Sequence, residues 1–297
     1  MQEKGKESIN FVERMFLNTI TPFLLEKTAV RGRFVRMDTV VGEILKRHQY
    51  PETIHHYLAE LIVLGVTLSN AFKFDGVFTL QVQGSENSPV SFMVVDVDSK
   101  GHVRACAHYK EEHSPFLSAK KRTLMELFGA GYLAFSIDQG DDLERYQGIV
   151  ELEGVTLKEC LQHYFKQSEQ LETAFYLNLT KDYQGVCIML QKLPFDAETD
   201  NEAFDDWFTA MSLLSTVKGE EAWHLGPEEL LHRLFWQEGL KVYDAKTVQF
   251  QCRCSREKLE VIMAQLSLED KQAVTKDGVI TVSCDYCGEV YLFEAGY

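Results

Sequence analysis

The sequence has no apolar run that approaches the roughly 18 residues of a membrane span. Its N-terminus, MQEKGKESINFVERMF, has no apolar core and no small-residue cleavage site, so we expect the mature chain to start at Met1. Positive charge is scarce, because 30 Lys and Arg face 45 Asp and Glu, for a formal net charge of −15. Such a chain repels the phosphate backbone of nucleic acids. We therefore expect a cytoplasmic protein that binds neither membranes nor nucleic acids.

Signatures of common enzymes are also missing. FGAGYL lacks the third glycine and the helix pattern of a dinucleotide site, and no phosphate-binding loop is present, which argues against an ATP-driven protein. No Ser/His/Asp set can be assembled. Asp96, Asp98 and Gly101 resemble the start of a calcium loop, but the later ligands are missing and a hairpin turn explains the stretch better. We expect a protein that is not an enzyme.

Hydrophobic periodicity predicts an α+β fold. Residues 9–72 are expected to be mostly helical, because VVGEILKRH and IHHYLAELIVLGVTL place apolar residues three and four apart. The period changes to two in VFTLQVQG, VSFMVVDVD and HVRACAHY, which predicts an antiparallel meander. Further strands are expected in YLAFSIDQG, QGIVELEG, FYLNLT and VCIMLQKL, and a helix in TLKECLQHYFKQSEQL. Residues 1–194 are predicted to form an α+β domain with helices packed on an antiparallel sheet.

The composition changes at Pro194. DAETDNEAFDD is dense in carboxylates, and two amphipathic helices with aromatic faces are expected after it, the second beginning at Pro227. Like charges crowded together oppose compact packing. We predict that residues 195–246 form a helical linker that needs a neighbour to stay folded; two ordinary surface helices fit the composition equally well.

The chain has seven cysteines, and four of them form two tight pairs: Cys252 and Cys254, then Cys284 and Cys287. Thiols in the cytosol are kept reduced, so such pairs are typical of metal ligands or redox groups rather than permanent disulfides. The other three lie in apolar patterns and are expected to be buried as small hydrophobic side chains: Cys106, Cys160 and Cys187.

Residues 247–297 are predicted to form a small zinc-binding domain. We expect a strand, a helix capped by Ser255, a short connection, and a hairpin that carries the second cysteine pair in its turn. A unit of this size buries too little apolar surface to be stable alone, and four thiolates make a closed tetrahedral zinc site. Two constitutive disulfides are the alternative. Oxidation of zinc-bound thiolates would remove the ligands and unfold the unit.

Several segments resemble one protein family. FQCRCSREKLE and GVITVSCDYCGEVYLF are similar to the zinc module of the redox-regulated 33-kDa chaperonin family, the oxidation-activated heat-shock holdases. GIVELEG, YFKQSEQLET and LLHRLFWQEGLKVYD fit the same family in the expected order. The first fifty residues match poorly, and the linker is more acidic than the family pattern.

The resemblance implies a function and a mechanism. Cys252, Cys254, Cys284 and Cys287 would hold one zinc ion in an inactive reduced form, and oxidation would join Cys252 to Cys254 and Cys284 to Cys287. The zinc domain and the metastable linker would then unfold, and the protein would dimerise and bind unfolding client proteins until ATP-dependent chaperones receive them. The linker candidates for packing on the first domain or for client contact are Trp207, Phe208, Leu213, Leu214 and Phe235.

Two other functions are compatible with the cysteine pattern. One is a constitutive zinc-ribbon protein that binds a nucleic acid or a protein partner without a redox switch. Carboxylates outnumber basic side chains in the last unit, which disfavours nucleic acid. The other is an enzyme with a structural zinc, for which the sequence offers no catalytic group.

Overall fold

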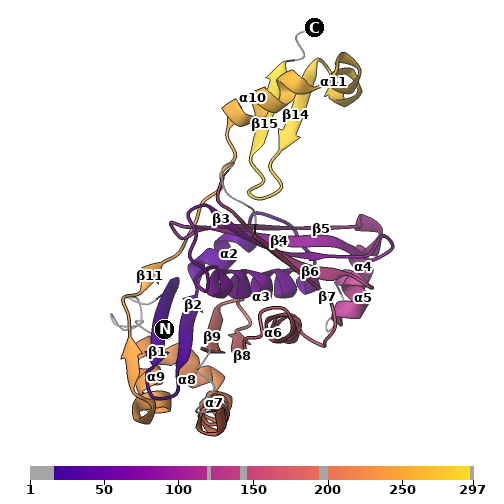
Figure 1. Cartoon of the computed structure of the whole chain (residues 1–297). Helices are drawn as coiled ribbons and strands as arrows, with labels where there is room; N and C mark the ends of the chain where they lie inside the picture. Colours follow the sequence, from indigo (N-terminus) through magenta and orange to yellow (C-terminus); the bar gives the residue numbers. More distant parts are fainter. Residues whose placement is uncertain (1–16, 119–121, 141–145, 194–199, 295–297) are drawn as a thin grey trace, which may run out of the picture.

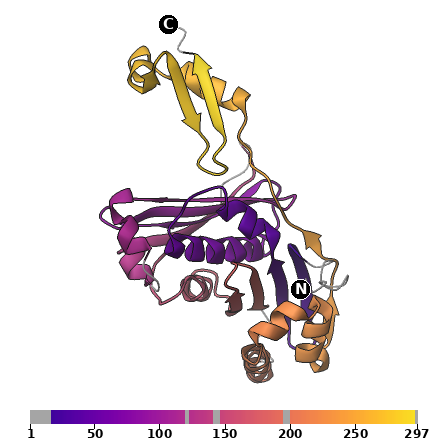
Figure 2. The same ribbon diagram turned by 180° about the vertical axis from the view of Figure 1, so that it is seen from behind.

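Two β-sheets with a long helix between them form the body of the protein (Figures 1 and 2). The computed structural model describes residues 17–118, 122–140, 146–193 and 200–294. The first sheet, which we call the β1 sheet, is antiparallel with the order β10-β1-β2-β9-β8, and β11 also pairs with β1. Its strands are β1 (Thr19–Leu25), β2 (Val30–Met37), β8 (Thr173–Leu179), β9 (Gly185–Lys192), β10 (Leu240–Val242) and β11 (Lys246–Thr247).

The second sheet, which we call the β3 sheet, has the order β12-β5-β4-β3-β6-β7. All its pairs are antiparallel except the short parallel pair between β12 and β5. Its strands are β3 (Val77–Gln83), β4 (Val90–Asp98), β5 (His102–Tyr109), β6 (Tyr132–Asp138), β7 (Tyr146–Glu151) and β12 (Gln249–Phe250).

Helix α3 (Glu52–Ser69) is buried over most of its length because it packs against both sheets. Its apolar residues surround the helix, the pattern of a helix that is buried on all sides. Gly65 permits the close approach to β4, since a Cβ at this position would lie 2.4 Å from Cγ1 of Val95. The other helices of the body are α2 (Thr39–Leu45), α4 (Ser114–Leu117), α5 (Leu124–Phe128) and α6 (Leu157–Gln167), with a 3-10 turn at Glu111–His113.

The α+β fold class is confirmed, and so is much of the predicted order of elements. The strands expected from two-residue periodicity are β3 to β9, and the helix expected after GIVELEG is α6. The helices expected before residue 72 are α2 and α3.

The prediction of mostly helical structure for residues 9–72 is wrong for residues 19–37, which form β1 and β2. Strand β2 is buried along nearly its whole length, so it lacks the alternation that marks a strand with one exposed face. It also carries Arg33 and Arg36 at buried positions, so its sequence does not read as that of a buried strand. The part of the prediction on residues 9–16 lies outside the described residues.

Three helices of the predicted linker cover one face of the β1 sheet (Figure 1). They are α7 (Asp200–Ser215), α8 (Gly219–His224) and α9 (Pro227–Phe235), followed by a 3-10 turn at Trp236–Glu238. Trp207, Leu214 and Phe235 are buried against sheet residues such as Phe23 and Phe34. The chain then pairs with β1 through β10 and β11, and with β5 through β12. The predicted linker therefore makes extensive contact with the body.

Arg36 connects β2 to helix α8 through a buried guanidinium. Its Nη2 donates to the carbonyl oxygen of Ala222 at 2.7 Å and to that of Leu225. These carbonyls lie at the C-terminal end of α8, where helix carbonyls lack intrahelical partners and the helix dipole is negative. The guanidinium also lies 5.4 Å from the ring centre of Phe34 and 5.6 Å from that of Trp223.

We expect Arg36→Met to lower the free energy of unfolding by about 2 kcal/mol, because two buried carbonyls lose a charged donor. Urea unfolding of the reduced protein measures the change, and hydrogen exchange locates it in α8. Arg233→Met is the control, since Arg233 makes only an exposed ion pair with Glu229 on α9. Equal stability of the two variants would contradict the role given to Arg36.

Glu60 is a buried carboxyl on α3. Burial raises its pKa from 4.5 to about 7, an effect that Lys158 partly offsets and Glu159 adds to. Because the folded-state pKa lies above the unfolded value, folding takes up a proton between these two pKa values. This residue therefore lowers stability as the pH rises from about 4.5 to about 7.

We expect Glu60→Gln to raise the free energy of unfolding by about 3 kcal/mol at pH 8 and to leave it nearly unchanged at pH 4. Urea unfolding at both pH values measures the difference between the variant and the parent protein. Glu112→Gln is the control, because the Glu112 side chain is largely exposed. A gain of the same size at both pH values would show that Glu60 does not titrate as described.

Candidate metal centre

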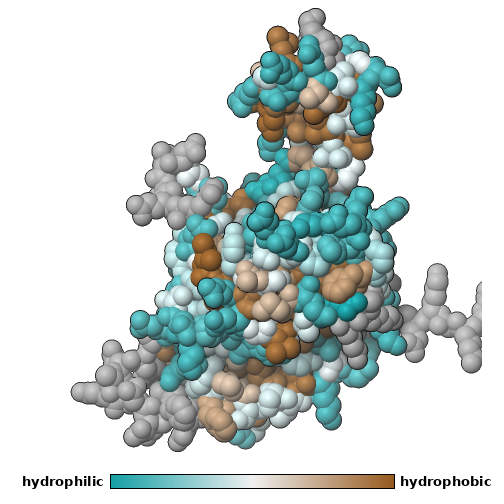
Figure 3. Space-filling view, turned by 90° about the vertical axis from the view of Figure 1, so that its right-hand side faces the viewer, coloured by the Kyte–Doolittle hydropathy of each residue, from teal (hydrophilic) through white to brown (hydrophobic). Residues whose placement is uncertain are grey.

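Residues 252–294 form a separate lobe, which we call the module, on top of the body (Figures 1 and 3). It contains α10 (Arg256–Gln265), α11 (Leu268–Val274) and a small antiparallel sheet of β13 (Thr275–Lys276), β14 (Val279–Ser283) and β15 (Val290–Glu294). The expected cap is present, since the Ser255 side chain accepts a hydrogen bond from the Lys258 amide at 3.4 Å. A short connection was expected after this helix, but the segment contains α11. Ser267 caps this helix, since its side chain accepts a hydrogen bond from the Asp270 amide.

The two cysteine pairs are carried by different segments of the module. Cys252 and Cys254 lie between β12 and α10, and Cys284 and Cys287 lie in the turn between β14 and β15. This turn is closed by hydrogen bonds from the Cys284 amide to the Glu289 carbonyl at 2.9 Å and from the Gly288 amide to the Cys284 carbonyl at 2.8 Å. Gly288 has a φ of 72°, a conformation that glycine adopts without strain.

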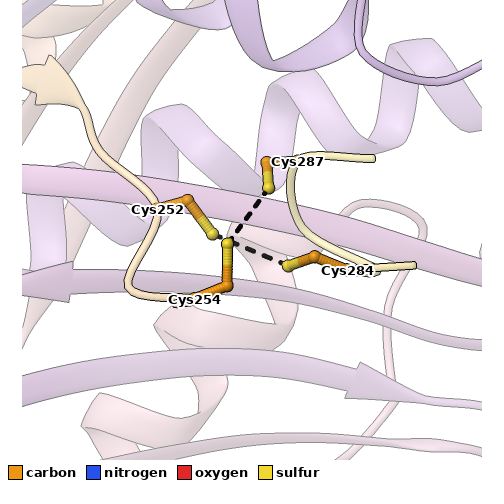
Figure 4. A group of neighbouring side chains, drawn as sticks. All are labelled: Cys252, Cys254, Cys284 and Cys287. Atoms are coloured by element: carbon orange, nitrogen blue, oxygen red, sulfur yellow. Dashed lines mark hydrogen bonds between the residues drawn. The ribbon is translucent and has the colours of Figure 1, made fainter. Parts of the chain in front are cut away.

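All four sulfur atoms lie within 4.8 Å of one another. Figure 4 shows the side chains converging from the two segments, and the sulfurs of Cys252 and Cys284 are 3.7 Å apart while those of Cys254 and Cys287 are 3.4 Å apart. A tetrahedral ion with metal–sulfur distances of about 2.3 Å needs sulfurs about 3.8 Å apart. The cluster therefore has the geometry to hold a metal ion. The seven cysteines are all free thiols.

The electrostatics of the cluster also favour a cation. Burial raises the pKa of Cys284 and of Cys287. Hydrogen bonds with neighbouring groups act on each pKa in both directions and leave it raised. Burial also opposes ionisation of Cys252, but hydrogen bonds from Cys254 and the neighbouring thiols outweigh it and lower its pKa to about 7. One thiolate can thus form at neutral pH, and further thiolates at such short distances repel it. A divalent ion removes this repulsion.

The suspected calcium loop is a hairpin turn, as the sequence favoured. Asp98 accepts hydrogen bonds from the amides of Lys100 and His102, both at 2.9 Å, and lies 2.8 Å from Nδ1 of His102. Asp96 pairs with Arg104 and Arg253. Within the described part of the chain, the four cysteines form the one cluster of three or more ligand-type side chains with metal-binding geometry.

The five linker candidates lie on helices α7 and α9, away from the cysteine cluster. Trp207, Leu214 and Phe235 are buried on the β1 sheet, Leu213 is partly buried, and Phe208 is 64% exposed. The three isolated cysteines are buried, as expected.

Sequence reasoning missed the residues that attach the module to the body. Arg253 and Tyr286 lie inside the two cysteine pairs, and their partners Asp96 and Arg104 lie on β4 and β5. The residues are ordinary charged and aromatic ones, and no local pattern joins Asp96 to a residue 157 positions away.

No helix in the described ranges is both long and apolar enough to cross a membrane. The fold and the site together define a class of proteins: a two-sheet α+β body that carries a small four-cysteine module near the C-terminus. The family model described as Hsp33 protein matches residues 18–294, and the chain belongs to this family. The predicted resemblance is thereby confirmed.

Relatives and a solved structure agree with this assignment. The 33 kDa chaperonin of Pseudomonas putida is 34% identical over 276 residues, covering 92% of this chain and 89% of that protein. The 33 kDa chaperonin of Proteus mirabilis is 35% identical over 281 residues, covering 93% of each chain. The crystal structure of the 33 kDa chaperonin from Thermotoga maritima aligns with a TM-score of 0.73 at 20% identity, covering 94% of this chain and 95% of that one, and shares the fold.

Proposed function

We propose that this protein is an ATP-independent holdase chaperone that is switched on by oxidation of a zinc centre at Cys252, Cys254, Cys284 and Cys287. The observation that carries the proposal is the weak core of the module. Between residues 252 and 294, only Ile280 and Phe293 are buried hydrophobic side chains. Two such side chains stabilise a fold by about 3–6 kcal/mol, far less than the ordering of about forty residues costs. The module therefore depends on its cysteine cluster.

Four thiolates are the ligand set of structural zinc sites, and soft sulfur ligands disfavour magnesium or calcium. When bound, zinc would supply a closed tetrahedral link between the segment before α10 and the β14–β15 turn. The chain itself supplies the two segments that carry the ligands: the Ser255 cap begins α10 directly after Cys254, and the turn closed at Gly288 carries Cys284 and Cys287.

Oxidation would remove this link. Each pair of thiolates gives two electrons to one peroxide molecule, which takes up two protons and becomes two water molecules, while a sulfur–sulfur bond forms. The resulting disulfides no longer hold the ion. The pairing of Cys252 with Cys254 and of Cys284 with Cys287 rests on the family resemblance, because all the sulfurs are mutually close in the folded cluster. Peptide mapping of the oxidised protein distinguishes this pairing from disulfides between the two segments.

The apolar surface for clients would come from the linker region. Helices α7 to α9 cover a hydrophobic cluster on the β1 sheet, and the chain runs from them through β10, β11 and β12 into the module. Unfolding of the module would pull on these short strands and loosen the helices. The uncovered cluster would bind unfolding proteins, favour a homodimer, and be covered again on reduction, when ATP-dependent chaperones take over the client.

The test treats zinc-loaded, reduced protein with peroxide at mildly raised temperature and follows zinc release, free thiols and the aggregation of a denatured client. We expect zinc release together with a gain of protection against aggregation. Full protection by the reduced, zinc-loaded form, or retention of zinc under oxidant, would reject the proposal. Full activity in the reduced form would instead support a constitutive zinc-ribbon protein that binds protein partners.

A further inference from the structure

One end of the outer face of strands β4 and β5, around Asp96 and Arg104, lies under the module. Side chains two residues apart share a face of a strand, and Asp96 lies opposite Arg104 while Val94 lies opposite Cys106. Val94 is 7% exposed and Cys106 is 2% exposed, although this face points away from α3. Tyr286 of the β14–β15 turn lies over Arg104, the neighbour of Cys106 on this face, with its ring centre 3.9 Å from the guanidinium carbon. The module therefore contributes to the burial of this patch.

Asp96 holds the first cysteine segment. Its Oδ2 accepts hydrogen bonds from Arg104 on β5 at 2.8 Å and from Arg253 at 2.6 Å. Arg253 lies between Cys252 and Cys254, and the Asp96 side chain is only 7% exposed. The carboxylate is thus largely removed from water, although the Arg253 side chain is 32% exposed. A buried carboxylate is sensitive to the loss of its charged partners.

Arg104 holds the second cysteine segment. Its guanidinium carbon lies 3.9 Å from the ring centre of Tyr286, which lies between Cys284 and Cys287. The Tyr286 carbonyl also lies 3.4 Å from Nε2 of His48, whose ring stacks on Tyr50 at 4.7 Å. Each cysteine segment therefore has its own attachment to the same small patch of the body.

We propose that Asp96, Arg104, Arg253 and Tyr286 form a clasp that docks the module on β4 and β5 only while a metal ion holds the two cysteine segments together. The metal fixes Arg253 and Tyr286 relative to each other, so both contacts form as one bivalent attachment. Without it each contact forms alone, and the avidity of the pair is lost. This inference rests on the proposed function, because it needs metal in the reduced form. It adds that the state of the cysteines controls whether the module is docked on the body, and not only whether the module is folded.

Cys106 provides a direct readout of docking. Undocking uncovers Val94 and Cys106, whereas Cys160 and Cys187 are buried within the main core. The reaction of Cys106 with a thiol reagent therefore measures the clasp, and the other two cysteines measure the integrity of the body.

The experiment exposes full-length, reduced, zinc-loaded protein to N-ethylmaleimide and quantifies the labelling of each cysteine peptide by mass spectrometry. We expect Asp96→Asn to raise the rate of Cys106 labelling by at least about tenfold, with Cys160 and Cys187 still protected and zinc still bound. Arg253→Ala tests the same contact from the module side and is expected to act alike. Asp244→Asn, at an exposed position outside the clasp, is the matched control and is expected to leave labelling unchanged. Chelation of zinc from the parent protein is expected to raise Cys106 labelling to at least the same extent.

The outcomes separate the clasp from the chaperone function. Unchanged Cys106 labelling in both Asp96→Asn and Arg253→Ala overturns the clasp, even if chelation raises it. Faster labelling in both variants supports the clasp whatever the client assay shows. If the undocked variants and the oxidised parent all fail to protect a denatured client, the proposed holdase function fails while the clasp stands.

Discussion

Removal of the metal from the reduced protein is expected to unfold the module while the two-sheet body stays folded. The binding free energy of a structural zinc ion is folding free energy, on the order of 10 kcal/mol in small zinc peptides. Ile280 and Phe293 cannot replace a contribution of that size. Cys284→Ser is expected to have the same effect, because three thiolates no longer close a tetrahedral site.

Hydrogen exchange measured along the chain tests this expectation. The amides of α10 and of β14 and β15 should lose protection in Cys284→Ser and after chelation, while those of α3 keep it. Ser283→Ala, an exposed change next to the ligand, is the control and is expected to behave like the parent protein. A module that keeps its protection without metal would contradict the assigned role of the cluster.

The second large effect is expected at Phe235, which anchors α9 on the β1 sheet. Its ring is fully buried and stacks on Phe23 with ring centres 6.0 Å apart. Phe235→Ala is expected to lower the free energy of unfolding by about 3–5 kcal/mol, the usual cost of removing a phenylalanine from a core. We also expect this variant to protect clients after a milder oxidant treatment than the parent protein needs, because its linker helices are closer to release.

Phe208→Ala is the matched control, since Phe208 is an aromatic residue of the same region that is 64% exposed. Its stability is expected to stay within about 0.5 kcal/mol of the parent protein. Urea unfolding measures both variants, and hydrogen exchange of α7 to α9 shows where stability is lost. Equal stability of Phe235→Ala and Phe208→Ala would show that α9 does not stabilise the body through this cluster.

The C-terminal part of the chain is attached to the body at two places, the clasp and the linker helices. The module contacts the body through the patch around Asp96, and the linker helices contact it through the β1 sheet. Strands β10, β11 and β12 lie between these two attachments along the chain, and each is only two or three residues long. Short strands have few ladder hydrogen bonds, so this region is expected to open at low cost once the module is free.

The elements that sequence reasoning predicted are those with strong local signals. Strands β3 and β6 alternate in burial because one face of their sheet packs on the core and the other is less buried. Helix α10 was predicted from Ser255, and the cysteine cluster from the spacing of its two pairs. Strands β1 and β2 were missed, because α3 and the linker helices bury both faces of this sheet and leave no alternation in β2.

By itself, the sequence determined the α+β class, the two closely spaced cysteine pairs and the amphipathic helices of the linker, because each depends on residues close together in the chain. Only the tertiary structure decided that Phe235 is buried while Phe208 is exposed, and that Arg253 meets Asp96. Amphipathic spacing shows which residues share a face of a helix but not how far the neighbouring sheet extends over that face. A contact between residues 157 positions apart depends on how the whole intervening chain folds, and no local pattern contains that information.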